Sequence, residues 1–277
     1  MNTQILVVWA AVGVAFAQTP DIEQIMSRVG RNQGQAQDLR KSFTYHQKQL
    51  LRMNRGNHKL AREERREYEV TPGVRGVKKE LIRFEGKYDY KGKPVAYDRP
   101  GYRYKDVDLD GELINEMSEE MTNDQNSRDG IEHDLFPLTY HQQLKYNFKI
   151  IGAETYRGRP VYRVSFEPKR HQDFDEAPWK GEALIDRAEY QPVRVTTNLA
   201  FKMPLLVKTL LGTDIKGLGF SVAYRKFEDG VWFPVSYGGE FEIRAVFFYK
   251  RTISVAMVNG DFKRTSVNSS VTYQTEQ

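Results

Sequence analysis

Apolar and polar residues alternate along much of the chain, with the two-residue period of β-strands that are buried on one face. The clearest stretch spans residues 156–197. In it Tyr162, Val164 and Phe166 share one face of a strand, and the polar residues between them share the other. Two further runs, 182–186 and 192–197, alternate in the same way. The pattern predicts an antiparallel meander of strand, long polar loop, strand, tight turn and strand.

Residues suited to turns separate these strands. Gly158 and Pro160 set a turn before the first strand, and Asp186 can accept backbone N–H bonds just beyond itself, which favours a tight turn. Pro192 cannot donate to a ladder and belongs at a strand start or an edge. Further strands are expected at residues 43–53, 60–70, 79–85, 146–151, 220–227, 231–237, 240–249, 252–258 and 262–273. The hairpin turns expected between most of the last five are Asp229-Gly230, Gly238-Gly239 and Asn259-Gly260.

Three segments have helical features. Residues 21–31 place four apolar side chains at i, i+3, i+4 and i+7, with Asp21 as N-cap and Gly30 as a possible end. Residues 112–121 follow Asp110-Gly111, a turn and N-cap region. Residues 201–211 are strongly apolar, and three interpretations stay open: a core helix, a lid over a lipid cavity, or an element that touches a membrane. The lid side chains would be Met203, Leu205, Leu206 and Leu210.

The N-terminus resembles an export signal. Residues 5–16 are apolar but too short to span a membrane, and Ala15 and Ala17 suit cleavage before Gln18. No Lys or Arg precedes the run, so a buried N-terminal helix is the alternative. Cleavage would leave one domain, residues 18–277, destined for the periplasm. The chain has no cysteine, so it carries no disulfide and no lipoprotein-type lipidated cysteine.

Charge points to no strong electrostatic partner. The net charge is +5 and the pI about 9.1. Nucleic acid is a poor partner for an exported chain; transient contact with an anionic lipid surface, or ordinary solubilising charge, accounts for the excess. The run 59–69 mixes Arg and Glu and is interpreted as a solvated strand face.

Candidate metal and catalytic groups each have a plainer interpretation. Residues 106–111 resemble the start of an EF-hand loop, but Met117 occupies the position of the bidentate glutamate, so an N-cap region is favoured over weak calcium binding. His133 and His141 could form a zinc site, and the alternative is that they are scattered polar histidines. The loop acids could pair for acid–base catalysis, and the alternative is a solvated acidic hairpin tip. Those acids are Asp173, Asp175 and Glu176. No catalytic motif is present, and we expect no enzyme activity, cofactor or metal.

The central residues carry a family resemblance. The strand beginning at Gly158, the sequence around Ile185-Asp186 and Pro192-Val193-Arg194, and the hairpin 229–234 resemble the LolA/LolB-like family of periplasmic lipoprotein carriers and outer-membrane lipoprotein-sorting proteins. The match covers about half of the chain and consists of packing and turn residues. It implies an α+β, mainly β fold: a strongly curved antiparallel sheet, an open or half barrel, with an N-terminal helix and one or two helices covering its concave face.

The resemblance also implies a function. A carrier of this family shields lipid, or the acyl chains of lipoproteins, in an apolar groove without chemistry. The alternative is a periplasmic interaction or sensor module of the same fold that binds an envelope protein partner. From strand alternation we expect the groove to be lined by Tyr162, Val164, Phe166, Ile185, Val193, Val195, Phe233, Val235, Phe241, Ile243 and Phe247.

Overall fold

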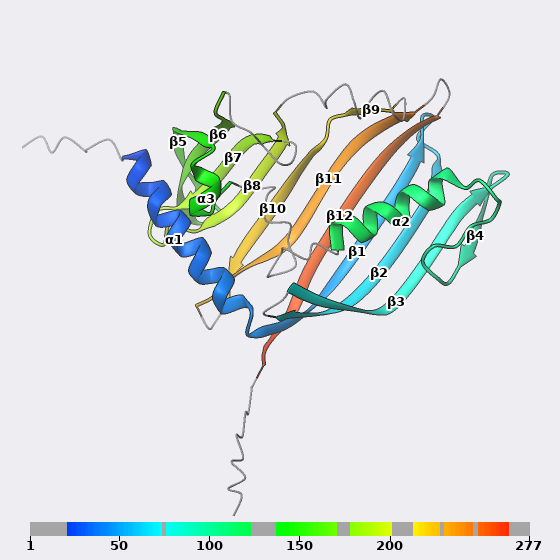
Figure 1. The fold of residues 1–277 in the computed structure, drawn as a ribbon, viewed down its shortest axis with the longest axis horizontal. Coiled ribbons are helices and arrows are strands. Elements are labelled where there is room, and N and C mark those ends of the chain that lie inside the picture. The colour runs from blue at the N-terminus through cyan, green and yellow to red at the C-terminus, as the bar shows by residue number, and fades with distance from the viewer. Residues whose placement is uncertain are drawn as a thin grey trace, which may run out of the picture.

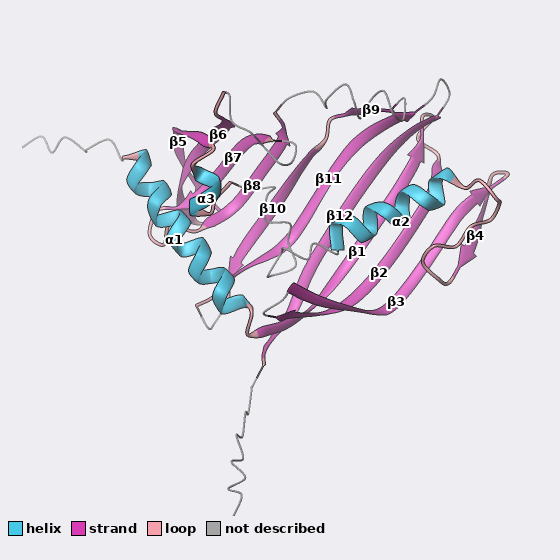
Figure 2. Ribbon diagram, in the orientation of Figure 1, coloured by secondary structure: helices cyan, strands magenta, loops and turns pink. Residues whose placement is uncertain are grey.

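A single open antiparallel sheet, curved around one concave face, makes up most of the protein (Figures 1 and 2). The structure is a computed structural model that describes residues 21–73, 76–122, 137–170, 178–200, 213–227, 230–245 and 249–265. The expected signal segment 1–17, the candidate lid segment 201–211 and Phe247 fall outside these residues. The class predicted from the sequence, mainly β with few helices, is confirmed.

Twelve strands and three helices form the described part. The strands are β1 Phe43–Arg55, β2 Leu60–Gly73, β3 Gly76–Tyr90, β4 Lys93–Tyr97, β5 Tyr146–Tyr156, β6 Arg159–Pro168, β7 Trp179–Asp186, β8 Pro192–Leu199, β9 Thr213–Lys216, β10 Gly219–Lys226, β11 Trp232–Ala245 and β12 Tyr249–Arg264. The helices are α1 Ile22–Arg40, α2 Leu109–Thr122 and α3 Tyr140–Gln143. The strand order is β4-β3-β2-β1-β12-β11-β10-β8-β7-β6-β5, and β9 pairs with β11. In the part of the sheet that is described, β4 and β5 are therefore the two edges.

All three helices lie on the concave face. α1 crosses the end of the sheet formed by β5 to β8, α2 lies over β12, β1 and β2, and α3 sits between α1 and β5 (Figure 1). The opposite surface of the sheet, which we call the outer face, carries none of them. The helices thus divide the concave face into a part under α1, a part under α2 and a part between them that no described helix covers.

Helix α1 begins as predicted but does not end at Gly30. The Asp21 carboxylate accepts a 2.9 Å hydrogen bond from the Glu23 N–H, which caps the helix. The helix continues to Arg40. A Cβ at Gly30 would lie 3.0 Å from Gln143 Nε2, so the glycine lets α3 approach closely instead of stopping the helix.

Two predicted hairpin turns are wrong, because β11 and β12 are each one continuous strand. A Cβ at Gly239 would lie 2.3 Å from the Gly219 carbonyl oxygen, and one at Gly238 would lie 3.1 Å from that of Val255. These glycines therefore allow neighbouring backbones to approach. Asn259 is buried in β12, and its side chain donates to the Pro234 carbonyl.

The turns of the central meander are confirmed. The Asp186 carboxylate accepts bonds from the N–H groups of Ala188 and Glu189, at 2.9 and 2.8 Å. Pro192 starts β8, and Gly158 turns the chain between β5 and β6 with a φ of +79°. Gly230 has the same φ in the β10–β11 connection, as expected for the hairpin there.

Candidate apolar binding site on the concave face

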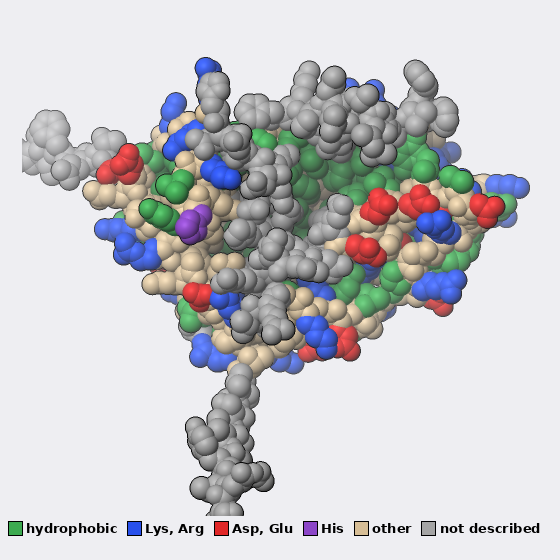
Figure 3. Space-filling model, in the orientation of Figure 1, with side chains coloured by type: hydrophobic (Ala, Val, Ile, Leu, Met, Phe, Trp, Pro, Cys, Tyr) green, Lys and Arg blue, Asp and Glu red, His purple; other side chains and the backbone are tan. Residues whose placement is uncertain are grey.

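The concave face carries the main apolar cluster of the protein, which we call the concave-face cluster. Six predicted groove residues are buried in it: Val164, Phe166, Ile185, Val195, Phe241 and Ile243. Tyr162 is partly buried and packs against it. α1 adds Ile25, Met26 and Val29, and α2 adds Ile114. In the space-filling view, hydrophobic side chains gather on the part of the concave face next to α2 (Figure 3).

Three other predicted groove residues pack elsewhere, because bulges shift the strand alternation. In β8, Arg194 pairs with Leu184 but Pro192 pairs with Ile185, so Val193 is the extra residue. It packs with Val161, Leu184 and Trp232 in a second cluster. Val235 is extra in the same way in β11, and it packs with Phe233 in a third cluster. Phe247 and the lid residues Met203, Leu205, Leu206 and Leu210 lie outside the described residues.

At the β5 edge the concave-face cluster continues into an open trough of about 830 Å³ between α1, α3 and β5. Its apolar lining comprises Ile22, Met26, Tyr140, Leu144, Tyr146 and Phe148. The Phe166 ring lies 6.2 Å from that of Tyr146 and 6.5 Å from that of Phe148, which joins trough and cluster. Lys149, Lys169, Glu23 and Glu167 stand among its polar residues. The trough therefore combines an apolar wall with positively and negatively charged side chains nearby.

Sequence reasoning missed the trough. The alternation of residues 146–151 marks Tyr146 and Phe148 as one face, and the first helix presents Ile22 and Met26, so the apolar signal is present in the sequence. The missing information is that α3 and the start of α1 stand beside β5 without filling the space. That is a tertiary arrangement, which periodicity does not encode.

The β2 part of the concave face under α2 is charged instead of apolar. Arg62 and Glu64 are fully buried, and Arg66 is nearly so. Arg62 Nε donates to the Tyr97 hydroxyl at 2.7 Å, that hydroxyl donates to Glu64 at 2.6 Å, and Arg66 Nε donates to Glu64 at 2.9 Å. Burial and then the Glu64 carboxylate raise the pKa of Tyr97, so its phenol stays a proton donor. The interpretation of run 59–69 as a solvated strand face is thus wrong for the face under α2.

The loop that resembles an EF-hand is the start of α2. Asp108, and not Asp110, is the N-cap: its Oδ1 accepts from the Gly111 N–H at 3.1 Å, and its Oδ2 accepts from Arg62 at 2.7 Å. Asp110 receives bonds from Arg251 Nε at 2.7 Å and the Tyr249 hydroxyl at 2.8 Å. Arginine thus occupies two of the three carboxylates that the calcium hypothesis needs, those of Asp108 and Asp110 but not that of Asp106.

Calcium is accordingly expected to leave stability unchanged. The midpoint of thermal unfolding should be the same in a chelator and in millimolar calcium, because binding would require the ion to displace Arg62 and Arg251. Differential scanning calorimetry in the two buffers measures this directly. A rise of several degrees with calcium, absent with magnesium, would contradict the assignment of this loop as a helix start.

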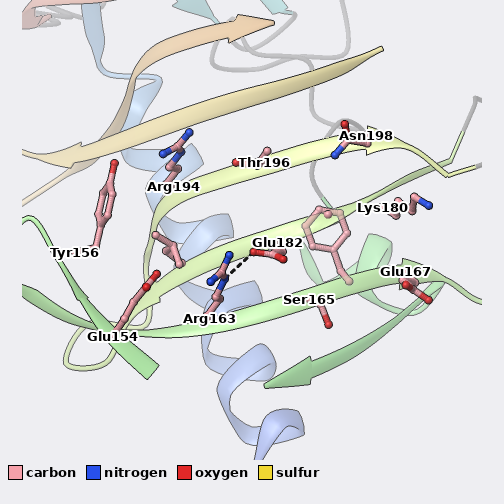
Figure 4. A pocket seen from close by; sticks show the side chains of 13 residues that line it. Glu154, Tyr156, Arg163, Ser165, Glu167, Lys180, Glu182, Arg194, Thr196 and Asn198 are labelled. Carbon is pink, nitrogen blue, oxygen red and sulfur yellow. Dashed lines mark hydrogen bonds and ion pairs between the residues drawn. The ribbon is translucent and has the colours of Figure 1, made fainter. Parts of the chain in front are cut away.

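A second hollow, of about 690 Å³, lies on the outer face of β5 to β8, with α1 behind the sheet (Figure 4). Its polar side chains come from neighbouring strands. Arg163 Nε donates to Glu182 at 2.7 Å, and Arg194 Nε donates to Ser221 at 3.1 Å. Such cross-strand pairs are usual on a solvated strand face. We therefore place the candidate site on the concave face.

The remaining candidate groups do not form a site in the described part of the chain. His133 and the acids Asp173, Asp175 and Glu176 lie outside it. His141 is in α3, where its ring meets that of Tyr140. Among the described residues, no three His, Asp or Glu side chains are grouped so that they could hold a metal ion.

Comparisons with known proteins give only distant likenesses. No family model matches the sequence, and no curated protein matches it. A DUF1329 family protein from Desulfovibrio piger aligns over 91% of this chain and 96% of its own, at 10% identity and a TM-score of 0.41. A domain from Vibrio parahaemolyticus, named for outer membrane lipoprotein sorting, aligns over 88% and 93%, at 13% identity and a TM-score of 0.38. At such TM-scores neither likeness establishes a family or a function.

Proposed function

We propose that this protein is a non-enzymatic carrier that binds an acyl chain of a lipid or a lipoprotein on its concave face. It would work in the periplasm, after removal of residues 1–17, in the sorting of outer-membrane lipoproteins. No helix among the residues that the structure describes is long and apolar enough to cross a bilayer. Contact with membranes would then be transient, at loading and release.

The observation that supports this proposal best is the trough. Its volume of about 830 Å³ lies within the range of ligand pockets, roughly 300–1,000 Å³. Its apolar wall continues into the concave-face cluster through Phe166. Each methylene that leaves water contributes about 0.8 kcal/mol, so about ten methylenes contribute roughly 8 kcal/mol, before the costs of immobilising the chain are subtracted. A contribution of that size corresponds to a Kd of about 1 μM, so affinities weaker than micromolar are expected once those costs are subtracted.

Purified protein, freed of lipid, should bind a fluorescent fatty-acyl probe saturably. Phe148→Glu places a charge on the partly buried wall of the trough and is expected to weaken binding at least about tenfold, because the carboxylate must be desolvated when the chain enters. Fluorescence titration measures both affinities. Val258→Glu is the matched control, since Val258 is 54% exposed on the outer face of β12 and should leave binding unchanged.

Absence of saturable binding by the folded wild type would contradict the carrier proposal. The interaction or sensor module that binds an envelope protein would then be the better hypothesis. Equal loss of binding in Phe148→Glu and Val258→Glu would show that the probe binds somewhere other than the trough.

A further inference from the structure

The two edges of the sheet differ in how open they are to another strand. β4 has five residues and contains Pro94, which has no N–H to donate. β5 has eleven residues and no proline. It pairs with β6 along one side, and no other described strand pairs with it. Long edge strands invite pairing with a further chain, so β5 is the edge where a partner would add.

Exposed apolar side chains gather at this edge. Ile151 in β5 is 49% exposed, and Tyr140 and Leu144, in and just after α3, are 63% and 57% exposed. α3 packs against β5, so the three side chains belong to one end of the molecule (Figure 1). Large apolar side chains that cluster in this way mark an interaction surface more often than a solvated one.

The charges of β5 are arranged symmetrically about its centre. Lys149 and Glu154 pair with Ser165 and Val161 of β6, and therefore share the outer face. Ile150 and Ala153 pair with Val164 and Tyr162, and share the concave face. The register shifts between Ile150 and Gly152, at the middle of the strand.

We propose that β5 pairs antiparallel with β5 of a second copy of this chain, about a two-fold axis between Ile151 and Gly152. Lys149 of each copy then lies opposite Glu154 of the other, and Ile150 lies opposite Ala153. Ile151 faces Gly152, and no atom lies within 4 Å of the position that a Gly152 Cβ would take, so the bulged side chain has room. The two sheets become one continuous sheet across the axis.

Charge complementarity favours a second copy over a foreign peptide. A two-fold axis forms every contact twice, so one lysine and one glutamate supply two favourable pairs. A foreign strand would need its own acidic and basic residues in the matching register. Lys149 also lines the trough and Glu154 the outer-face hollow, but neither side chain makes a hydrogen bond within the described part of the chain, so both are available to a second copy.

The test is an exchange of charge between copies. Wild-type protein is expected to show a concentration-dependent dimer in sedimentation equilibrium. Lys149→Glu and Glu154→Lys alone should each weaken the dimer about tenfold or more, because like charges then face each other twice. A 1:1 mixture of the two variants should dimerise again, because acidic positions of one face basic positions of the other. Lys180→Glu, at an exposed position of β7 nearby, is the control that changes the same charge away from the edge.

Three outcomes would overturn the proposal: a monomeric wild type at high protein concentration, single variants that dimerise like the wild type, or a mixture no more associated than its components. Circular dichroism of each variant excludes misfolding as the cause of a monomer. Sedimentation equilibrium of lipid-free protein measures only the molar mass of the particles. Its result therefore does not depend on whether the protein binds an acyl chain.

Discussion

Replacement of Arg62 by methionine is expected to lower the free energy of unfolding by about 3–5 kcal/mol. The Arg62 side chain is fully buried, and it donates to Asp108 and Tyr97. Methionine keeps much of the volume but leaves the Asp108 carboxylate, only 1% exposed, without its cationic partner. Unfolding in urea, followed by tryptophan fluorescence, measures the loss.

Arg83→Met provides the matched control. Arg83 also pairs with glutamates, but its side chain is 63% exposed, and surface ion pairs contribute little. Its replacement should leave the free energy of unfolding nearly unchanged. If the two variants lost equal stability, the buried network would not be the reason for the effect. Combining Arg62→Met with Asp108→Asn should restore part of the loss, because the unpaired charge is then removed.

Gly181→Ala is expected to destabilise the protein by about 3 kcal/mol, although it adds a single methyl group. A Cβ at Gly181 would lie 1.9 Å from the Thr196 carbonyl oxygen and 3.0 Å from the Phe166 ring. The oxygen belongs to the backbone of β8, so relief requires β7 and β8 to separate. Chemical unfolding quantifies the effect, and a weaker acyl affinity is expected to accompany it, because Phe166 joins the trough to the cluster.

Gly34→Ala tests the same substitution where space is free. No atom lies within 4 Å of the added Cβ in the middle of α1, and alanine has the higher helix propensity. A gain of about 0.5–1 kcal/mol is expected. Were Gly181→Ala as harmless as Gly34→Ala, the close approach of β7 and β8 would be refuted.

Strand faces could be predicted from the sequence wherever the alternation runs uninterrupted. Tyr162, Val164 and Phe166 share the concave face because nothing breaks β6 between them. Val193 was misplaced because a bulge is one extra residue, and an extra residue leaves no mark in a pattern of apolar and polar positions. The glycines of β11 were taken as turns for a related reason: a turn and a close backbone approach require the same residue.

The charged part of the concave face was beyond prediction for a different reason. Residues 59–69 carry Arg and Glu on both faces of β2. The buried and the exposed positions therefore have the same residue types, and the sequence pattern does not distinguish them. Arg62 and Glu64 are buried while Arg65 is exposed, and their partners come from β4 and from the start of α2, distant in sequence. Only the tertiary structure shows that these charges are neutralised in pairs.

The strand order has a consequence for how the chain reaches its fold. β1 pairs with β12, so Phe43 lies beside Arg264, and this pairing joins the part of the sheet built from β1 to β4 to the part built from β5 to β11. Contacts between such distant segments form late, because a long loop must close first. Each part can gather its own local hairpins early, but the concave face exists as one surface only after β12 has inserted between β1 and β11. A chain that emerges from a membrane N-terminus first would therefore lack this continuous concave face until β12 has crossed.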